Sequence, residues 1–151
     1  MAEVQKRLIL KILGTPLAKQ SARFVALGKG QIRSFQKKEV VEKERNIAYD
    51  IKSQLPENFV LFDTPIFVNM ILIFTPPASL PKKTLKTIEE GNLVPKDKKP
   101  DIDNLQKTLL DAMQGVVYTN DSRIYSMSAS KFYGKIPQIW LEIIVYENIQ
   151  N

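Results

Sequence analysis

The stretch KKPDIDNLQKTLLDAMQGVVYTNDSRI, residues 98–124, sets acids and lysines together where a helix is about to begin. Apolar residues recur at helical spacing through residues 104–114, and Gly115 follows as a residue suited to the position just after a helix. The stretch therefore predicts a helix with one buried side, and it places Asp101 and Asp103 at the entrance of that helix.

Two ordinary explanations account for part of this pattern. Asp103 has Gln106 three residues later, which is the spacing of a capping box, and its charge suits the positive end of the helix dipole. Asp103, Lys107 and Asp111 also follow at four-residue spacing, as in a solvated ladder of ion pairs of small energy. Neither explanation accounts for Asp101.

A third carboxylate follows the helix. The segment 115–121, if extended, covers about 23 Å, whereas a helix of about 11 residues is roughly 16 Å long. We therefore expect Asp121 to reach back to Asp101 and Asp103. Three such carboxylates repel one another unless a cation joins them. Mg²⁺ takes few protein carboxylates and keeps water and phosphate oxygens as its other ligands, so the pattern indicates an open Mg²⁺ site, with Mn²⁺ as an alternative ion.

An acidic, metal-binding site surrounded by lysines is suited to phosphodiester hydrolysis. The metal makes a hydroxide available near neutral pH and stabilises the charge that gathers on the phosphate. Lys107 is placed to stabilise that charge or to position the water. Lys96, Lys98 and Lys99 are candidates to hold the flanking phosphates of DNA.

Composition removes several other classes of function. The 151 residues suit one domain, residues 1–151, and the net charge of +6 favours a polyanionic partner. The chain has neither cysteine nor histidine, which excludes disulfides, thiolate or histidine metal sites and histidine-based catalytic triads. Its start is interrupted by charges too often for a signal peptide, and no run reaches the roughly 20 apolar residues of a membrane span. We expect a cytoplasmic protein with no membrane partner.

The pattern of apolar residues predicts an α+β domain with a mostly antiparallel sheet of about four strands and two main helices on one face. A basic, glycine-punctuated stretch after the first strand is interpreted as a loop or hairpin with the arms RFVAL and QIRSF. The predicted strands are 7–13, 66–74, 123–134 and 138–147, and the predicted helices are 36–55, a short one at about 81–90, and 104–114.

Residues 98–124 resemble the signature of the RusA family of Holliday-junction resolvases, small endonucleases of phage and prophage origin. The signature is a Lys-Pro-Asp-x-Asp-Asn-Leu-x-Lys block, a helix with Asp-Ala, a Gly-Val-x-Tyr turn and an acidic pair. The resemblance implies a homodimeric, Mg²⁺-dependent endonuclease that cuts four-way DNA junctions by paired symmetric nicks in recombination and repair. A two-fold dimer would present two equivalent sites to a two-fold symmetric junction.

The resemblance also assigns residues. It implies that Asp101, Asp103 and Asp121 bind the metal and that Lys107 is the essential lysine. This chain has Asn120 before Asp121, where family members commonly have a second acid, and this puts metal affinity in question. The candidates for a supporting role or an additional ligand are Asn104, Asp111 and Asn120.

Other residues and functions stay open at this point. Lys19, Arg23 and Arg33 are candidate contacts to the junction backbone or ordinary surface charges. Tyr118 is expected to be a core or loop anchor rather than a surface for base stacking, and Trp140 is expected in the core. The alternatives are a non-catalytic module that binds branched nucleic acid, and a metal-dependent nuclease of another specificity, such as for RNA or flapped DNA.

Overall fold

The computed structural model describes residues 3–17, 23–26, 32–35 and 38–148. About four strands, two main helices and one short helix were expected, and the chain forms eleven elements in those ranges. In chain order they are β1 Glu3–Leu13, β2 Arg23–Ala26, β3 Ile32–Phe35, α1 Lys38–Gln54, β4 Ile66–Phe74, α2 Lys82–Glu89, β5 Val94–Pro95, α3 Ile102–Met113, the 3-10 turn η1 Asp121–Arg123, β6 Ile124–Tyr133 and β7 Gln138–Asn148.

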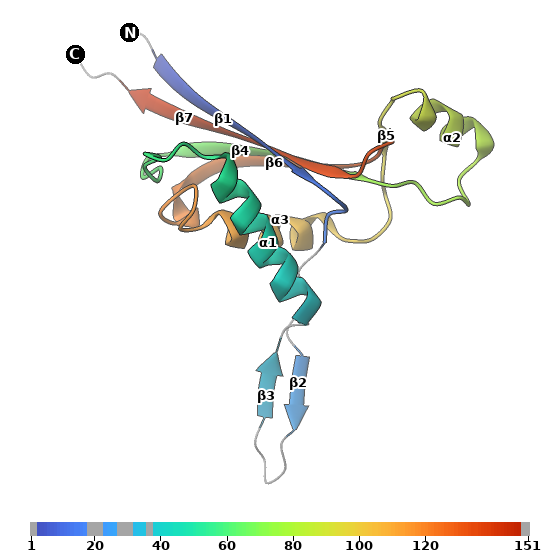
Figure 1. The fold of residues 1–151 in the computed structure, drawn as a ribbon, viewed down its shortest axis with the longest axis horizontal. Coiled ribbons are helices and arrows are strands. Elements are labelled where there is room, and N and C mark those ends of the chain that lie inside the picture. Colours follow the sequence, from blue (N-terminus) through green and yellow to red (C-terminus); the bar gives the residue numbers. More distant parts are fainter. Residues whose placement is uncertain (1–2, 18–22, 27–31, 36–37, 149–151) are drawn as a thin grey trace.

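Five strands form one sheet in the order β1-β7-β4-β6-β5, and β2 pairs with β3 in a separate hairpin (Figure 1). β4 and β6 are parallel, and the chain between them passes through α2, the short edge strand β5 and α3. The other pairings between strands in the described ranges are antiparallel. The α+β class and the mostly antiparallel sheet are confirmed, with β5 as the additional short strand and α2 as the third helix.

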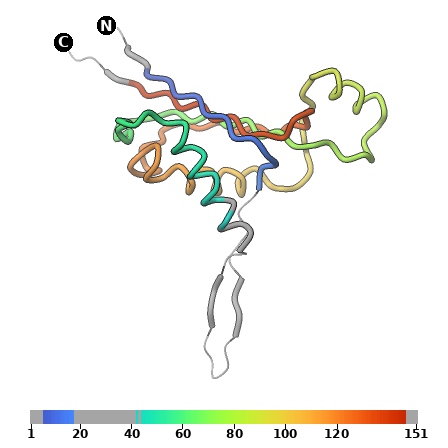
Figure 2. The backbone as a smooth tube through the Cα atoms, in the orientation of Figure 1, coloured from blue at the N-terminus to red at the C-terminus, as the bar shows by residue number. Residues whose placement is uncertain are grey.

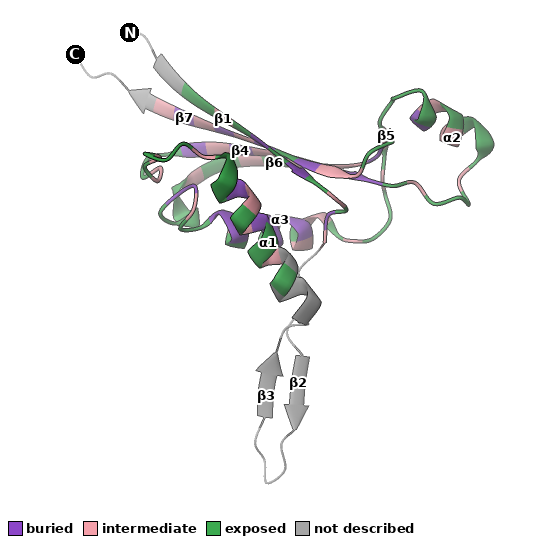
Figure 3. Cartoon of the chain, in the orientation of Figure 1, coloured by how far each residue is buried: buried purple, intermediate pink, exposed green. Residues whose placement is uncertain are grey.

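The hydrophobic core lies between the sheet and the two longer helices. Alternate residues of β4 are buried, from Ile66 to Leu72, as are those of β7 from Ile139 to Val145. α1 supplies Ile47 and Ile51, while α3 supplies a stripe that includes Leu105, Leu109 and Met113. Figure 3 shows buried parts of α1, α3 and the sheet where the two helices lie against it, and Figure 2 shows the chain between β4 and α3 projecting beyond the end of the sheet.

No helix in the described ranges covers the sheet face turned away from these helices, and Trp140 lies on that face. The expectation of a core tryptophan is wrong, since Trp140 is 40% exposed. The reason is strand phase: Ile139 and Leu141 point toward the helices, so the residue between them must point the other way. The indole N–H donates to Gln138 Oε1 at 2.7 Å, and the Lys11 ammonium lies 5.4 Å from the ring centroid.

The predicted elements otherwise lie close to the observed ones. The two hairpin arms pair antiparallel, and α2 ends before Gly91, whose φ is +98°. No helix in the described part of the chain is long and apolar enough to cross a membrane. The largest difference in position is at the start of β1, which begins at Glu3 rather than at residue 7. The difference that matters for the site is that α3 begins at Ile102 rather than at residue 104.

Candidate functional site

The first turn of α3 presents two carboxylates. Asp101 is the N-cap residue by backbone geometry, with φ −67° and ψ 143°, but its side chain makes no capping hydrogen bond. Asp103 lies inside the first turn, where its Oδ1 accepts from the N–H of Asn104 at 2.9 Å. The capping-box interpretation of Asp103 is therefore wrong, because the helix starts earlier than that interpretation requires. Both carboxylates are exposed.

The predicted ladder of ion pairs is not formed at its start. Lys107 follows Asp103 by about one turn of α3, and both side chains are exposed. Among the described residues no ion pair joins Lys107 to Asp103. The ammonium group of Lys107 is thus presented to solvent on the same helix face as the carboxylate of Asp103. Asn104 is half-buried beside them.

The C-terminal end of α3 is closed by a compact turn. Gly115, at φ +78°, donates its N–H to the carbonyl of Tyr118 at 2.9 Å. Tyr118 is buried, as expected of an anchor, and its hydroxyl donates to the carbonyl of Leu110 at 2.6 Å. Burial raises the pKa of Tyr118, and the nearby negative charges of Asp121 and Asp111 raise it further. These two acids therefore lie near the end of α3 where Tyr118 is anchored.

Asp121 is held at this same end. Its N–H donates to Oε1 of Gln114 at 3.2 Å, and Gln114 is the C-cap residue of α3. Asn120 caps η1, because its Oδ1 accepts from the N–H of Ser122 at 2.9 Å. The side-chain oxygen that was a candidate metal ligand is thus engaged with the backbone.

The expectation that Asp121 returns to Asp101 and Asp103 is wrong for the single chain. Residues 115–118 fold back on the helix end instead of running extended, so Asp121 stays beside Gln114. Asp101 is at the other end of a 12-residue helix, which is about 18 Å long. Within the described residues no three acidic side chains gather in a way that would hold a metal ion.

Asp101 and Asp103 nevertheless fit a magnesium ion in their chemistry. Both supply hard carboxylate oxygens, both are exposed, and Mg²⁺ is commonly held by one or two carboxylates together with water and phosphate oxygens. Asp121 supplies the same donor type but from a separate position.

Asp63, which precedes β4 in the chain, holds the loop that carries Asp121 through side-chain contacts. The Asp63 carboxylate accepts from the hydroxyl of Thr119 at 2.6 Å and pairs with Nε of Arg123 at 3.0 Å. The hydrogen bond from Thr119 and the charge of Arg123 lower the pKa of Asp63. Phe62 adds two backbone hydrogen bonds to the same loop, with Val117 and Thr119. Nothing in the sequence pattern pointed to Asp63.

The segment before α3 is also fixed, and by a residue that the sequence did not single out. Nζ of Lys131 donates to the carbonyls of Lys98 at 2.8 Å and Pro100 at 2.9 Å. The Lys98 and Lys99 side chains are exposed. Lys96 is different, because its ammonium lies 4.7 Å from the ring centroid of Tyr133 and 3.3 Å from the Tyr133 hydroxyl. This placement favours a structural role for Lys96 over contact with phosphate.

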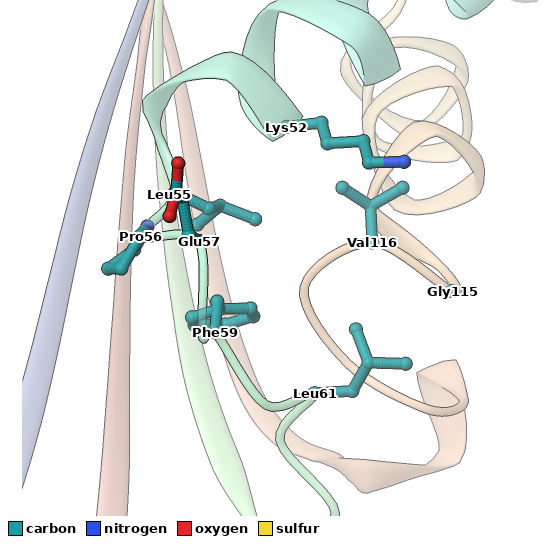
Figure 4. A pocket seen from close by; sticks show the side chains of 8 residues that line it. All are labelled: Lys52, Leu55, Pro56, Glu57, Phe59, Leu61, Gly115 and Val116. Atoms are coloured by element: carbon teal, nitrogen blue, oxygen red, sulfur yellow. The ribbon is translucent and has the colours of Figure 1, made fainter.

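A pocket of about 380 Å³ lies beside the C-terminal turn of α3, between that turn and the end of α1 (Figure 4). Its lining is mainly apolar and includes Leu55, Phe59 and Val116, with Lys52 and Glu57 as the charged residues. Neither of the acids at the start of α3 lines the pocket.

The remaining candidates for contact with DNA come from the early part of the chain. Arg23 belongs to β2 and Arg33 to β3, while Lys19 falls outside the described residues.

The fold and the start of α3 together define a class: a small mixed-sheet α+β protein that presents the exposed carboxylates of Asp101 and Asp103 and the exposed ammonium groups of Lys98, Lys99 and Lys107 just before and within the first half of one helix. The profile of the endodeoxyribonuclease RusA family matches residues 14–144, which include all of these carboxylates and lysines. The chain therefore belongs to the RusA family, a family of nucleases that act on DNA.

One relative has no assigned function. The uncharacterized protein YqaN of Bacillus subtilis (strain 168) is 30% identical over 92 residues, which are 61% of this chain and 63% of that protein. The aligned region thus spans less than two thirds of that relative.

Proposed function

We propose that this protein is a divalent-metal-dependent endodeoxyribonuclease that resolves four-way DNA junctions by paired symmetric nicks in recombination and repair. The observation that supports this most is the family match, because residues 14–144 include the exposed acids Asp101 and Asp103 at the start of α3, together with Lys107 and Asp121. Mg²⁺ is the proposed cofactor, with Mn²⁺ as its substitute, and the net charge of +6 suits a DNA partner.

Asp101 and Asp103 would hold the cation, with Asp121 as the third carboxylate. When bound, a divalent cation would supply the Lewis-acid chemistry of phosphodiester hydrolysis. The ammonium group of Lys107, which has no ion-pair partner in the described part of the chain, lies about one turn from Asp103 and would stabilise negative charge on the phosphate. Lys98 and Lys99 are exposed immediately before Asp101 and would hold the backbone of the same DNA strand.

We infer that the three acids are united only in a homodimer. Asp121 lies at one end of α3 and the other two acids at the opposite end. If two copies of α3 packed antiparallel about a two-fold axis near Lys107, Asp121 of the partner subunit would lie beside Asp101 and Asp103. Because such an axis repeats every contact, two equivalent sites would form, as paired nicks require.

The separation of the acids within one chain is also the observation that favours the alternative function. A protein that binds branched DNA without cutting it would not need Asp121 to meet the other two acids. The dimer described above removes this difficulty, whereas a monomeric protein in solution would support the alternative.

The first experiment is cleavage of a labelled four-way junction against linear duplex of the same sequence, with and without Mg²⁺. Wild type is expected to nick the junction in symmetric pairs, and Asp103→Asn to be inactive while it still binds the junction. Asp103→Asn should melt at the wild-type temperature or higher in metal-free buffer and gain less from Mg²⁺. Junction binding by wild type without cleavage in Mg²⁺ or Mn²⁺ would contradict the proposal. Flapped DNA and RNA substrates then test the alternative of a metal-dependent nuclease with another specificity.

A further inference from the structure

Lys131 connects the sheet to the segment that leads into α3. It lies on β6, which pairs with β4 on one side and β5 on the other. Its ammonium donates to the carbonyls of Lys98 and Pro100 at 2.8 and 2.9 Å. Its own carbonyl accepts from the N–H of Lys96 at 3.0 Å. The segment 96–100 is therefore attached to one strand by both the backbone and the side chain of a single residue.

Of the two hydrogen bonds from the Lys131 ammonium group, the one to the carbonyl of Pro100 bears most directly on Asp101. The carbonyl of Pro100 belongs to the peptide group that joins Pro100 to Asp101, so the hydrogen bond from Lys131 fixes the orientation of that peptide group. Hydrogen bonds from an ammonium group are stronger than neutral ones. The bond to Pro100 is partly buried, whereas the bond to Lys98 is exposed. Because Asp101 makes no capping hydrogen bond of its own, its carboxylate depends on the backbone for its placement.

We propose that Lys131 is a positioning residue, which holds the start of α3 so that the carboxylates of Asp101 and Asp103 lie together for metal binding. This inference rests on the nuclease function proposed above. Lys131 acts through the backbone, since the hydrogen bonds of its ammonium group go to two carbonyl oxygens and not to either carboxylate. Replacing residues that hydrogen-bond directly to metal ligands typically changes metal affinity or activity by about 10–100-fold. Lys131 acts through the backbone, so we expect an effect at the lower end of that range.

The test compares Lys131→Met, which removes the donors at similar size, with Lys131→Arg, which keeps a cation and several N–H groups. Lys135→Met is the matched control, because Lys135 is an exposed lysine just beyond β6 whose contact, with Glu89 at 3.4 Å, lies away from α3. Binding of Mn²⁺ is measured directly from the free ion by electron paramagnetic resonance, alongside junction binding without metal, junction cleavage and thermal melting.

Lys131→Met is expected to bind Mn²⁺ about tenfold more weakly than wild type, with unchanged junction binding. Its cleavage should need correspondingly more metal and recover when metal is raised. Lys131→Arg should restore most of the affinity, and Lys135→Met should match wild type. If Lys131→Met does not fold, Lys131→Gln takes its place as the variant without charge.

Wild-type Mn²⁺ affinity in a folded Lys131→Met protein would overturn the inference, even if its melting temperature fell, because the residue would then be only structural. Loss of junction binding comparable to that in Lys98→Met would also overturn it, since Lys131 would then contact DNA. Failure of the wild-type protein itself to bind Mn²⁺ or to cut would instead overturn the proposed function, and the inference with it.

Discussion

Tyr118 links two parts of the proposed site through one hydroxyl group. Its ring is buried beneath the loop that carries Asp121, and its O–H donates to the carbonyl of Leu110 on α3. The hydroxyl must stay protonated to act as this donor. Burial and the neighbouring negative charges of Asp121 and Asp111 all raise its pKa, so the donor is retained in alkaline solution.

Tyr118→Phe is expected to lower the free energy of unfolding by about 1 kcal/mol at neutral pH. The carbonyl of Leu110 keeps its hydrogen bond from Gln114, so the loss should not exceed that of one hydrogen bond. A pKa raised in the folded state contributes stability below the unfolded value of 10.0, and this contribution is lost as pH rises above it. Urea denaturation at neutral and alkaline pH should show the difference between the two proteins shrinking; a constant difference would contradict this account.

Asp63→Ala tests the second anchor of the same loop. The pKa of Asp63 is lowered in the folded protein, so its contribution is present above the ordinary value of 3.8 and is lost as pH falls through the lowered pKa. The variant should melt below wild type at neutral pH, and the two melting curves should converge toward about pH 2. A difference that persists in acid would show that Asp63 acts through something other than its charge.

At the scale of the element, α3 is where the sequence was most informative and also where it failed. Its buried stripe, its approximate length and the glycine after it follow from local spacing, which is why they were predictable. The path of residues 115–121 does not follow from local spacing. It depends on contacts with Phe62 and Asp63, which are distant in the sequence, and with the side chain of Gln114, which the sequence pattern did not single out. The same limit explains why Lys131 was missed and why Asp121 was expected at the wrong end of the helix.

Gly115→Ala should destabilise the protein by about 1 kcal/mol. No atom lies within 4 Å of a Cβ built at this position, so the cost comes from the positive φ alone. Gly91→Ala is the matched control, because Gly91 has φ +98°, equally open surroundings and a position after α2. Both variants should lose similar stability by denaturant titration. Only Gly115→Ala should reduce junction cleavage, because the turn at residues 115–118 positions the loop that carries Asp121. Equal effects of the two variants on cleavage would contradict this role of the turn.

At the scale of the whole molecule, the sheet has one face covered by α1 and α3 and one uncovered face. Hydrophobic alternation predicted that sheet and helices pack together, but the phase of β7 that exposes Trp140 could be set only by the neighbouring strands. The dimer proposed here uses α3 and leaves the uncovered face free.

Trp140 is the single tryptophan of the chain and reports on that face. We expect its emission maximum and its quenching by acrylamide to stay constant as protein concentration is raised through the monomer–dimer transition. That transition is followed independently by analytical ultracentrifugation. A blue shift with reduced quenching on dimerisation would place the interface on the uncovered sheet face and would exclude the antiparallel pairing of α3.

The most direct test of the central claim mixes two inactive proteins. Asp103→Asn and Asp121→Asn are each expected to leave the junction uncut as homodimers. In a mixed dimer, sites that span the two subunits would comprise one site with both substitutions and one with none. The account therefore predicts that the mixture nicks one strand of the four-way junction. If mixing either variant with wild type shows that subunits exchange, yet the two variants together cut nothing, the three acids do not act across the dimer.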